Sequence, residues 1–269
     1  MRIWIERYAA FVRAAWMVDL QYRADIVLWL LWGITEPAVA LGIWWSIAKQ
    51  SGGEVDGFSG PAFVQYFFAI TLVNQLTQAW QSWYIEQWIA EGEMNHRLTR
   101  PLKPIHEAVA DNIAFKARTA TVILAVWIAV SLIWPDARLP FRPRHIGLAA
   151  AAIVLGAAIR FLNNFTVGLF GFWTTRAAAL VELQMAVGMF LSGQLAPLDL
   201  LPERVRVFAH LLWFPYMIAF PVSLLVGTGD SATSPIEGFT GQIVWLAIWW
   251  VAYRAVWRKG LERYGAVGG

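Results

Sequence analysis

The chain has 269 residues, of which 58% are apolar and only 14% charged, with a formal net charge of +3. Soluble domains carry about 25% charged residues, so this composition excludes an ordinary soluble protein and predicts an all-α polytopic membrane protein. The absence of cysteine excludes disulfides and thiolate metal sites. The four scattered histidines predict no metal site, and basic residues in such a chain report membrane topology, not nucleic-acid binding.

Residues 1–24 are expected to form an amphipathic helix and not a membrane span. Apolar side chains such as Trp4, Tyr8 and Phe11 recur at helical spacing on one face, with Arg2 among the charges opposite. A basic, aromatic helix of this kind is typical of an element that lies in the membrane interface. A helix packed on a protein surface fits the same pattern, and both descriptions stay open.

Six apolar segments are predicted to cross the bilayer as helices, a crossing that takes about 20 residues. We expect the first to be interrupted at Glu36-Pro37, because an interior proline removes a helical hydrogen bond. The spans are predicted at residues 26–48, 62–84, 112–134, 145–174, 178–192 and 239–257.

Residues 195–226, between the fifth and last spans, are predicted to form short re-entrant or interfacial helices that return to the side they left. Part of this segment is apolar enough to cross, but interior prolines break helices. Broken helices at membrane depth are tolerated only where protein or a water-filled cavity covers them. The prolines concerned are Pro197, Pro202, Pro215 and Pro221.

The distribution of Lys and Arg favours six spans with both termini in the cytoplasm. With that topology most basic residues fall in the inner segments, as the positive-inside rule requires. A seventh full span would send the basic segment 254–263 to the outside, against the rule.

No motif of catalytic chemistry is present. The chain lacks the phosphate-binding Gly-x-x-x-x-Gly-Lys-Ser/Thr loop, so it does not bind ATP in that mode, and no nucleophile or metalloprotease signature occurs. We therefore predict no enzyme active site and no catalytic residues on this chain.

Two ionisable residues inside predicted spans are the main functional candidates, because a charge in a membrane is costly unless it is paired. Glu36 in the first span and Arg160 in the fourth are predicted at similar depth, so we expect them to form an ion pair. The pair fits a static brace between helices, which is favoured, or a gate or substrate contact.

The second predicted span carries polar side chains at helical spacing. Such amides join membrane helices by hydrogen bonds, and they serve equally well to line a hydrophilic path. Packing is favoured here, and the same two roles apply to Asn163 and Asn164 in the fourth span. The stripe consists of Thr71, Asn74, Gln78 and Gln81.

A polar, proline-closed elbow at residues 86–108 separates the second and third spans. It includes Glu91-Gly-Glu-Met-Asn-His-Arg-Leu-Thr-Arg-Pro-Leu-Lys-Pro104 and is too short to fold as a domain. Pro101 and Pro104 fix its exit, so a push on the elbow would be transmitted to the next span. The elbow therefore predicts a piece that takes force or a signal from a soluble partner.

Taken together, these features resemble the permease subunits of ABC-2-type ATP-driven exporters, in the bacterial branch in which two related six-span permeases often accompany one ATPase. The match covers most of the chain in order and spacing. It is carried by Gln21-Tyr-Arg-Ala-Asp25, Tyr66-Phe-Phe-Ala69, Glu91-Gly-Glu93, Leu98-Thr-Arg-Pro-Leu-Lys-Pro104, Phe172-Trp-Thr-Thr-Arg176, Ser192-Gly-Gln-Leu-Ala-Pro-Leu-Asp-Leu-Leu-Pro202 and Phe220-Pro-Val222 followed by Gly227.

The resemblance implies that the elbow forms a coupling helix, at about residues 89–103, that docks in a cleft of the ATPase. Residues 1–23 would be the family's interface helix, and residues 195–226 its outer re-entrant helices. Arg160 in mid-span has no counterpart in the family pattern. The implied ATPase contacts are Glu91, Glu93, Arg97, Arg100 and Lys103.

The function that follows is an exporter permease in the bacterial inner membrane that moves an amphipathic or hydrophobic substrate by alternating access. Its implied partners are an ABC ATPase dimer, a second identical or related permease and membrane lipids. No cofactor is expected on this chain, because ATP and Mg²⁺ would bind the ATPase. Two alternatives remain open: an ion-coupled secondary carrier using Glu36, Arg160 and Glu182, and a membrane scaffold that does not transport.

Overall fold

The computed structural model describes residues 23–140, 143–174, 177–227 and 234–267. The predicted interface helix at residues 1–24 lies almost entirely outside the described residues. Its prediction therefore stays a prediction.

The fold is built from helices. The longer ones are α2 (Arg23–Gln50), α3 (Gly60–Thr77), α4 (Gln81–Ala90), α6 (Pro104–Ile133), α7 (Pro143–Gly168), α8 (Ala177–Leu191) and α12 (Pro235–Val267). The short ones are α5 (Glu93–Leu98), η1 (Pro135–Ala137), η2 (Leu169–Phe172), η3 (Leu198–Leu200), α9 (Glu203–His210), α10 (Phe214–Met217) and α11 (Ala219–Val226).

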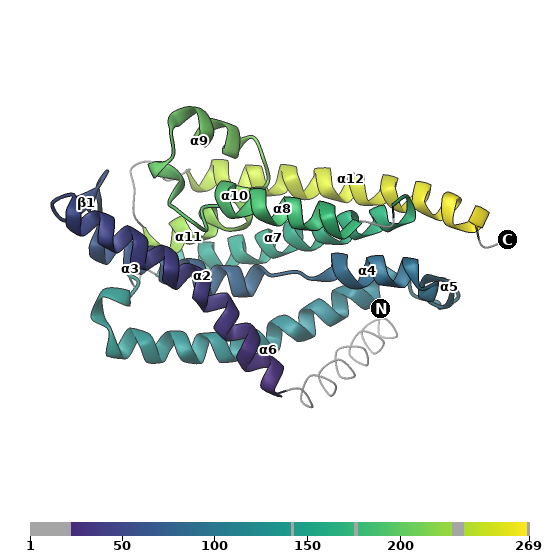
Figure 1. Cartoon of the computed structure of the whole chain (residues 1–269), viewed down its shortest axis with the longest axis horizontal. Coiled ribbons are helices and arrows are strands. Elements are labelled where there is room, and N and C mark those ends of the chain that lie inside the picture. Colours follow the sequence, from purple (N-terminus) through teal and green to yellow (C-terminus); the bar gives the residue numbers. More distant parts are fainter. Residues whose placement is uncertain (1–22, 141–142, 175–176, 228–233, 268–269) are drawn as a thin grey trace.

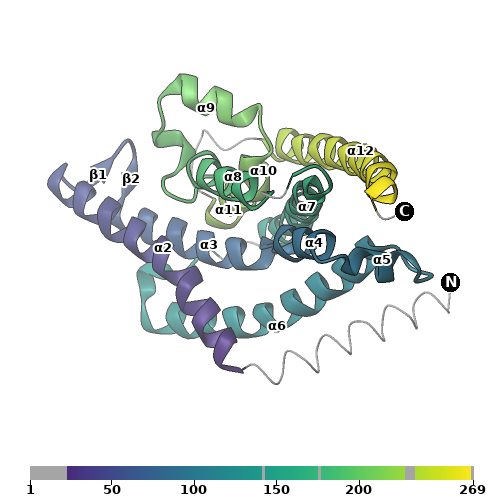
Figure 2. The same cartoon turned by 45° about the vertical axis from the view of Figure 1, so that its right-hand side comes forward.

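Helices α6, α7, α8 and α12 lie roughly along the long axis of the molecule, α2 crosses this direction obliquely, and α9 lies on one side of the bundle (Figure 1). The elbow helix α5 and the C-terminal end of α12 lie at one end in both views, and the β-hairpin lies at the other (Figure 2). The elbow, which follows the second predicted span, therefore lies at the same end of the molecule as the C-terminal end of the last predicted span.

A two-stranded hairpin, β1 (Glu54–Val55) with β2 (Phe58–Ser59), adds a feature that the all-α prediction did not contain. Its loop is Asp56-Gly57, and both residues have positive φ, of 46° and 82°. Asp-Gly is a preferred pair for such tight hairpin turns. Ser59 then caps α3, since its hydroxyl accepts from the Ala62 amide at 3.4 Å.

The prediction that Glu36-Pro37 interrupts the first span was wrong. Residues 23–50 form one helix with Pro37 in its interior. Pro37 is buried, and it lies beside α3 and α6 in an apolar cavity of about 190 Å³. A proline inside a membrane helix is tolerated when neighbouring helices cover the site.

The prediction of one continuous second span at residues 62–84 was also wrong. Helix α3 ends at Thr77, residues 78–80 are not helical, and α4 begins at Gln81. The backbone of Gln78 is extended, with φ −53° and ψ 142°. No proline or glycine marks this break, so its cause lies in the tertiary contacts described below.

The two larger hydrophobic clusters among the described residues lie toward opposite ends of the bundle. One joins α2 and α3 to residues 195–226, which we call the outer segment after its predicted location. The joining side chains include Phe63, Phe67, Ile70, Met217 and Val222. The other lies at the elbow end, where Ile89, Met94, Phe165 and Phe172 pack together with Tyr253 of α12. Because Met94 is fully buried in the second cluster, α5 is anchored to the helix bundle.

The segment 195–226 contains the short helices η3, α9, α10 and α11. Each of its four prolines precedes one of these helices or lies in its first turn, where a missing amide donor costs little. The segment is tied to the bundle at its start, because Trp44 Nε1 donates to the Leu195 carbonyl at 2.8 Å. Tyr66 Oη likewise donates to the Gly193 carbonyl at 2.8 Å.

Two helices of the described residues are long and apolar enough to cross a membrane, Pro104–Ile133 and Pro143–Phe172, and they cover most of the third and fourth predicted spans. Helix α6 begins at Pro104, inside the elbow and eight residues before the predicted start of the third span at residue 112. Helix α8 has 15 residues, roughly 22 Å of rise, and is short for a crossing. Helix α12 extends well beyond the predicted 239–257 on its C-terminal side.

Candidate functional site

The side chain of Arg160 lies at the C-terminal end of α3. Its Nη1 donates to Asn74 Oδ1 at 2.7 Å and to Thr77 Oγ1 at 3.2 Å. A helix C-terminus carries partial negative charge, so a guanidinium is favoured there. Arg160 thus joins α7 to the point where the second span is broken.

The predicted Glu36–Arg160 ion pair does not form in the described structure. The two charges are close enough to interact electrostatically, but Arg160 is hydrogen-bonded to Asn74 and Thr77 instead. One carboxylate oxygen of Glu36 is buried and has no hydrogen-bond partner among the described residues. The prediction failed because it compared depths along two helices and ignored the polar acceptors of α3.

The break between α3 and α4 is stabilised from α6. Lys116 Nζ donates to the Gln78 carbonyl at 2.6 Å and to Asn112 Oδ1 at 2.7 Å. Asn112 Nδ2 also donates to the Gln78 carbonyl, at 3.4 Å. A carbonyl freed at a helix end needs such donors inside a membrane protein, because no bulk water replaces them.

Polar side chains of α7 also tie this helix to α4 and α8. Ser82 Oγ of α4 donates to Asn164 Oδ1 at 3.0 Å. Asn163 exchanges hydrogen bonds with Gln184 of α8. Both asparagines therefore join helices, and both also line the central cavity described next, so each of the two roles considered for them stays a prediction.

The same polar residues surround a cavity of about 120 Å³ at the centre of the bundle. Asn74 and Gln78 line it, whereas Gln81, although 1% exposed, is not among its lining residues. Gln194, directly before the outer segment, closes one side of the cavity, since its Nε2 donates to Asn74 Oδ1 at 2.9 Å. The charged lining residues are Glu36 and Arg160.

The cavity extends to the surface between α4 and α8. Trp83 of α4 and Met185 of α8 both line it, and they are 41% and 46% exposed. The site therefore combines a polar interior with an apolar mouth, an arrangement suited to a molecule with a polar group and an apolar part.

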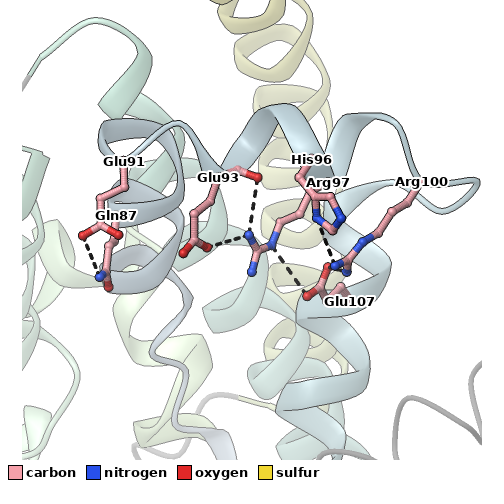
Figure 3. Close-up of polar contacts among 7 residues, drawn as sticks. All are labelled: Gln87, Glu91, Glu93, His96, Arg97, Arg100 and Glu107. Carbon is pink, nitrogen blue, oxygen red and sulfur yellow. Dashed lines mark hydrogen bonds and ion pairs between the residues drawn. The ribbon is translucent and has the colours of Figure 1, made fainter.

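At the elbow end, Figure 3 shows a compact set of ionic contacts around α5. Arg97 Nη1 contacts Glu93 Oε2 at 2.7 Å, and Arg97 Nε lies 3.6 Å from Glu107 Oε1. Arg100 Nη1 contacts Glu107 Oε2 at 3.1 Å and Nη2 lies 3.2 Å from His96 Nδ1. Glu107, in the first turn of α6, thereby joins the elbow to the third predicted span.

Arg97 is mostly occupied within the chain. Its guanidinium lies 3.7 Å from the centre of the Trp88 ring, and its side chain is 15% exposed. A cation stacked on tryptophan and paired with carboxylates holds a fixed orientation. Arg97 therefore braces the elbow from inside, which the sequence-based expectation of a partner contact did not foresee.

The exposed surface of the elbow is made mainly of other residues. Glu91, Glu93 and Lys103 are exposed, and Arg100 is partly exposed. Helix α5 spans only Glu93–Leu98, so it is shorter than the implied coupling helix at 89–103. Gly92 separates it from α4 with a φ of 76°, a left-handed conformation that glycine adopts without strain.

Within the described residues, no group of three or more His, Asp or Glu side chains is arranged to hold a metal ion. The polar groups around the central cavity are engaged mainly in contacts between helices.

This fold, with polar groups gathered inside apolar helices and a charged elbow at one end, is that of an all-helical membrane protein. A family model described as ABC-2 family transporter protein matches residues 36–268, and the chain belongs to that family. The curated proteins contain no match to it. Membership of an ABC transporter family favours a permease over a scaffold that does not transport.

Proposed function

We propose that this chain is the membrane-spanning permease subunit of an ATP-driven exporter, powered by a separate ABC ATPase that docks on the elbow. The observation that carries the proposal is the internal bracing of α5. Its charged contacts and the burial of Met94 make it a rigid piece that joins α4 directly to α6. A rigid elbow transmits a displacement that a flexible loop would absorb.

The proposed topology has six spans, with both termini and the elbow in the cytoplasm of a bacterial inner membrane. The location of α5 and the end of α12 at one end of the molecule supports it (Figure 1). The broken helix α3–α4 then counts as one crossing, and α9, α10 and α11 lie on the outer side. The working unit is a dimer of permeases with two ATPase copies.

Transport proceeds by alternating access, with an amphipathic or hydrophobic substrate. Closure of the ATPase dimer displaces α5, and α4 and α6 carry this movement to the break at Gln78. The break lies between Arg160 and Lys116, two cations on different helices. A shift of α4 therefore changes the contacts that surround the central cavity.

The test is co-purification in detergent with the ABC ATPase encoded beside the chain. The substitutions Glu91→Lys and Lys103→Glu reverse exposed charges without touching the contacts of Arg97. We expect their combination to abolish ATPase capture while the permease remains monodisperse. Glu54→Lys, which reverses an exposed charge in the hairpin at the far end, is the matched control. An ATPase captured equally by all variants would show that the elbow is not the docking element.

A further inference from the structure

The central cavity brings together two opposite charges that are not bonded to each other. Glu36 comes from α2 and Arg160 from α7, and both line the same space. Buried charges are costly unless they are paired, whether in membranes or in protein interiors. A molecule that pairs both would therefore be favoured in this cavity.

Arg160 has donor capacity left for a ligand. A guanidinium has five N–H donors, and in the described structure only Nη1 donates to protein groups. Asn74, Thr77 and the end of α3 hold the side chain in place, so its remaining donors are oriented before a ligand arrives. Arginine in a fixed orientation is well suited to phosphate and carboxylate groups.

Glu36 offers the complementary half of the site. One of its oxygens is buried without a hydrogen-bond partner in the described part of the chain, so it is free to accept from an ammonium group. A third charge nearby, Lys116, is engaged with the Gln78 carbonyl and Asn112 and is not among the lining residues. The lining of the cavity thus carries one acid and one base.

We propose that this cavity binds the headgroup of an amphipathic zwitterion, with Arg160 pairing its phosphate or carboxylate and Glu36 pairing its ammonium group. A purely anionic headgroup is repelled by Glu36 and a purely cationic one by Arg160. The amides of Asn164 and Gln184 line the same space and add neutral hydrogen-bonding groups.

The size and opening of the cavity fit this ligand class. A volume of about 120 Å³ holds a compact headgroup but not an acyl chain. The apolar mouth at Trp83 and Met185 provides exposed surface for the chain outside. That the bound molecule is also the transported one rests on the exporter function proposed above.

The experiment measures binding to the purified permease alone, by native mass spectrometry from a neutral detergent. Three probes share one acyl chain: lysophosphatidylethanolamine is zwitterionic, lysophosphatidic acid is anionic and monoacylglycerol is uncharged. We expect the zwitterion to bind at least about tenfold more tightly than the other two, a difference equal to one well-made charged contact.

Two substitutions assign the charges. In Glu36→Gln the zwitterion loses about tenfold in affinity and the anion gains, because the repulsion is gone. In Arg160→Gln both phospholipids lose the contact to their phosphate, so the zwitterion loses at least about tenfold and the anion, still repelled by Glu36, binds no better than monoacylglycerol. The matched controls are Glu182→Gln and Arg258→Gln, which change the same residue types at exposed positions of α8 and α12 and leave all three affinities unchanged.

Several outcomes overturn the proposal. These are tighter binding of lysophosphatidic acid than of the zwitterion, or zwitterion affinity that neither substitution alters. Glycerophosphoethanolamine, the headgroup without a chain, should compete only weakly. Competition as strong as that of the lysolipid would identify a soluble zwitterion as the ligand and exclude the amphipathic one.

If Arg160→Gln does not fold, Glu36→Gln decides alone, since it leaves the Arg160 contacts intact. ATPase capture is measured separately, so either proposal can fail without the other.

Discussion

Arg160 and Asn74 form the central polar contact of the bundle, with 2.7 Å between Nη1 and Oδ1. The same oxygen accepts from Gln194 Nε2 at 2.9 Å. One amide side chain therefore holds α7, α3 and the outer segment together. This contact lies where the second span is broken, so it fixes the position of the break relative to the cavity.

Replacement of Asn74 by Leu should destabilise the protein, because it leaves the buried guanidinium short of an acceptor. A hydrogen bond to a charged group contributes about 2 kcal/mol, so we expect a clear fall in the thermal midpoint in detergent. Asn74→Asp should restore it by keeping the acceptor. Thr71→Val is the control, since Thr71 bonds only to the Phe67 carbonyl of its own helix. Equal midpoints for Asn74→Leu and Thr71→Val would contradict the role given to Asn74.

Replacement of Lys116 by Met should loosen the break between α3 and α4. It removes the closest donor to the Gln78 carbonyl and leaves only the longer contact from Asn112. We expect faster hydrogen exchange of the amides at the start of α4, because local opening becomes easier. Lys259→Met, at an exposed position of α12, should leave these amides as they are. Unchanged exchange in Lys116→Met would mean that packing alone holds the break.

Close packing of α7 on α4 depends on Gly168. A Cβ at this position would lie 2.8 Å from the Ser82 Cα and 3.0 Å from the Ser82 carbonyl oxygen, both of them backbone atoms. Gly168→Val should therefore displace α4 and reduce both folded yield and ATPase capture. Gly147→Val makes the same change in the same helix, where no atom lies within 4 Å of the added Cβ. Similar yields of the two variants would argue against close contact between α7 and α4.

Lowering the pH should destabilise the packing of the outer segment around His210. Burial lowers the pKa of His210, and Arg206 acts in the same direction, while Asp199 opposes it. A histidine whose pKa is lowered by folding is held in its neutral form in the folded state. Its contribution to the free energy of unfolding is therefore complete above about pH 6.5, and it is lost as the pH falls through the lowered pKa. We expect the thermal midpoint to fall between pH 7.5 and 5.5, and to fall less in His210→Gln. An identical pH dependence of both proteins would remove His210 from this account.

The positions of α6 and α7 could be predicted from the sequence, because each contains a long apolar run. The short helices of residues 195–226 were equally predictable from prolines such as Pro202 and Pro215, since a proline restricts where a helix can continue. Pro37 shows the limit of this rule. Neighbouring helices cover it, and the chain stays helical through it.

The break after Thr77 had no local signal. It depends on Lys116, which lies 38 residues beyond Gln78 along the chain. In the same way, the partners of Arg160 and the stacking of Arg97 on Trp88 depend on helices meeting in space. Spacing along one helix predicts which residues share a face, but it does not predict which neighbour supplies the hydrogen bond.

The end of α12 has a practical consequence for labelling. Leu261 and Tyr264 pack against the cluster that contains Ile89 and Met94, so a fluorescent protein or affinity tag fused after α12 would sit beside the elbow and obstruct any partner there. The Asp56-Gly57 loop lies at the opposite end (Figure 1). An epitope inserted in that loop would report surface accessibility and leave the elbow free.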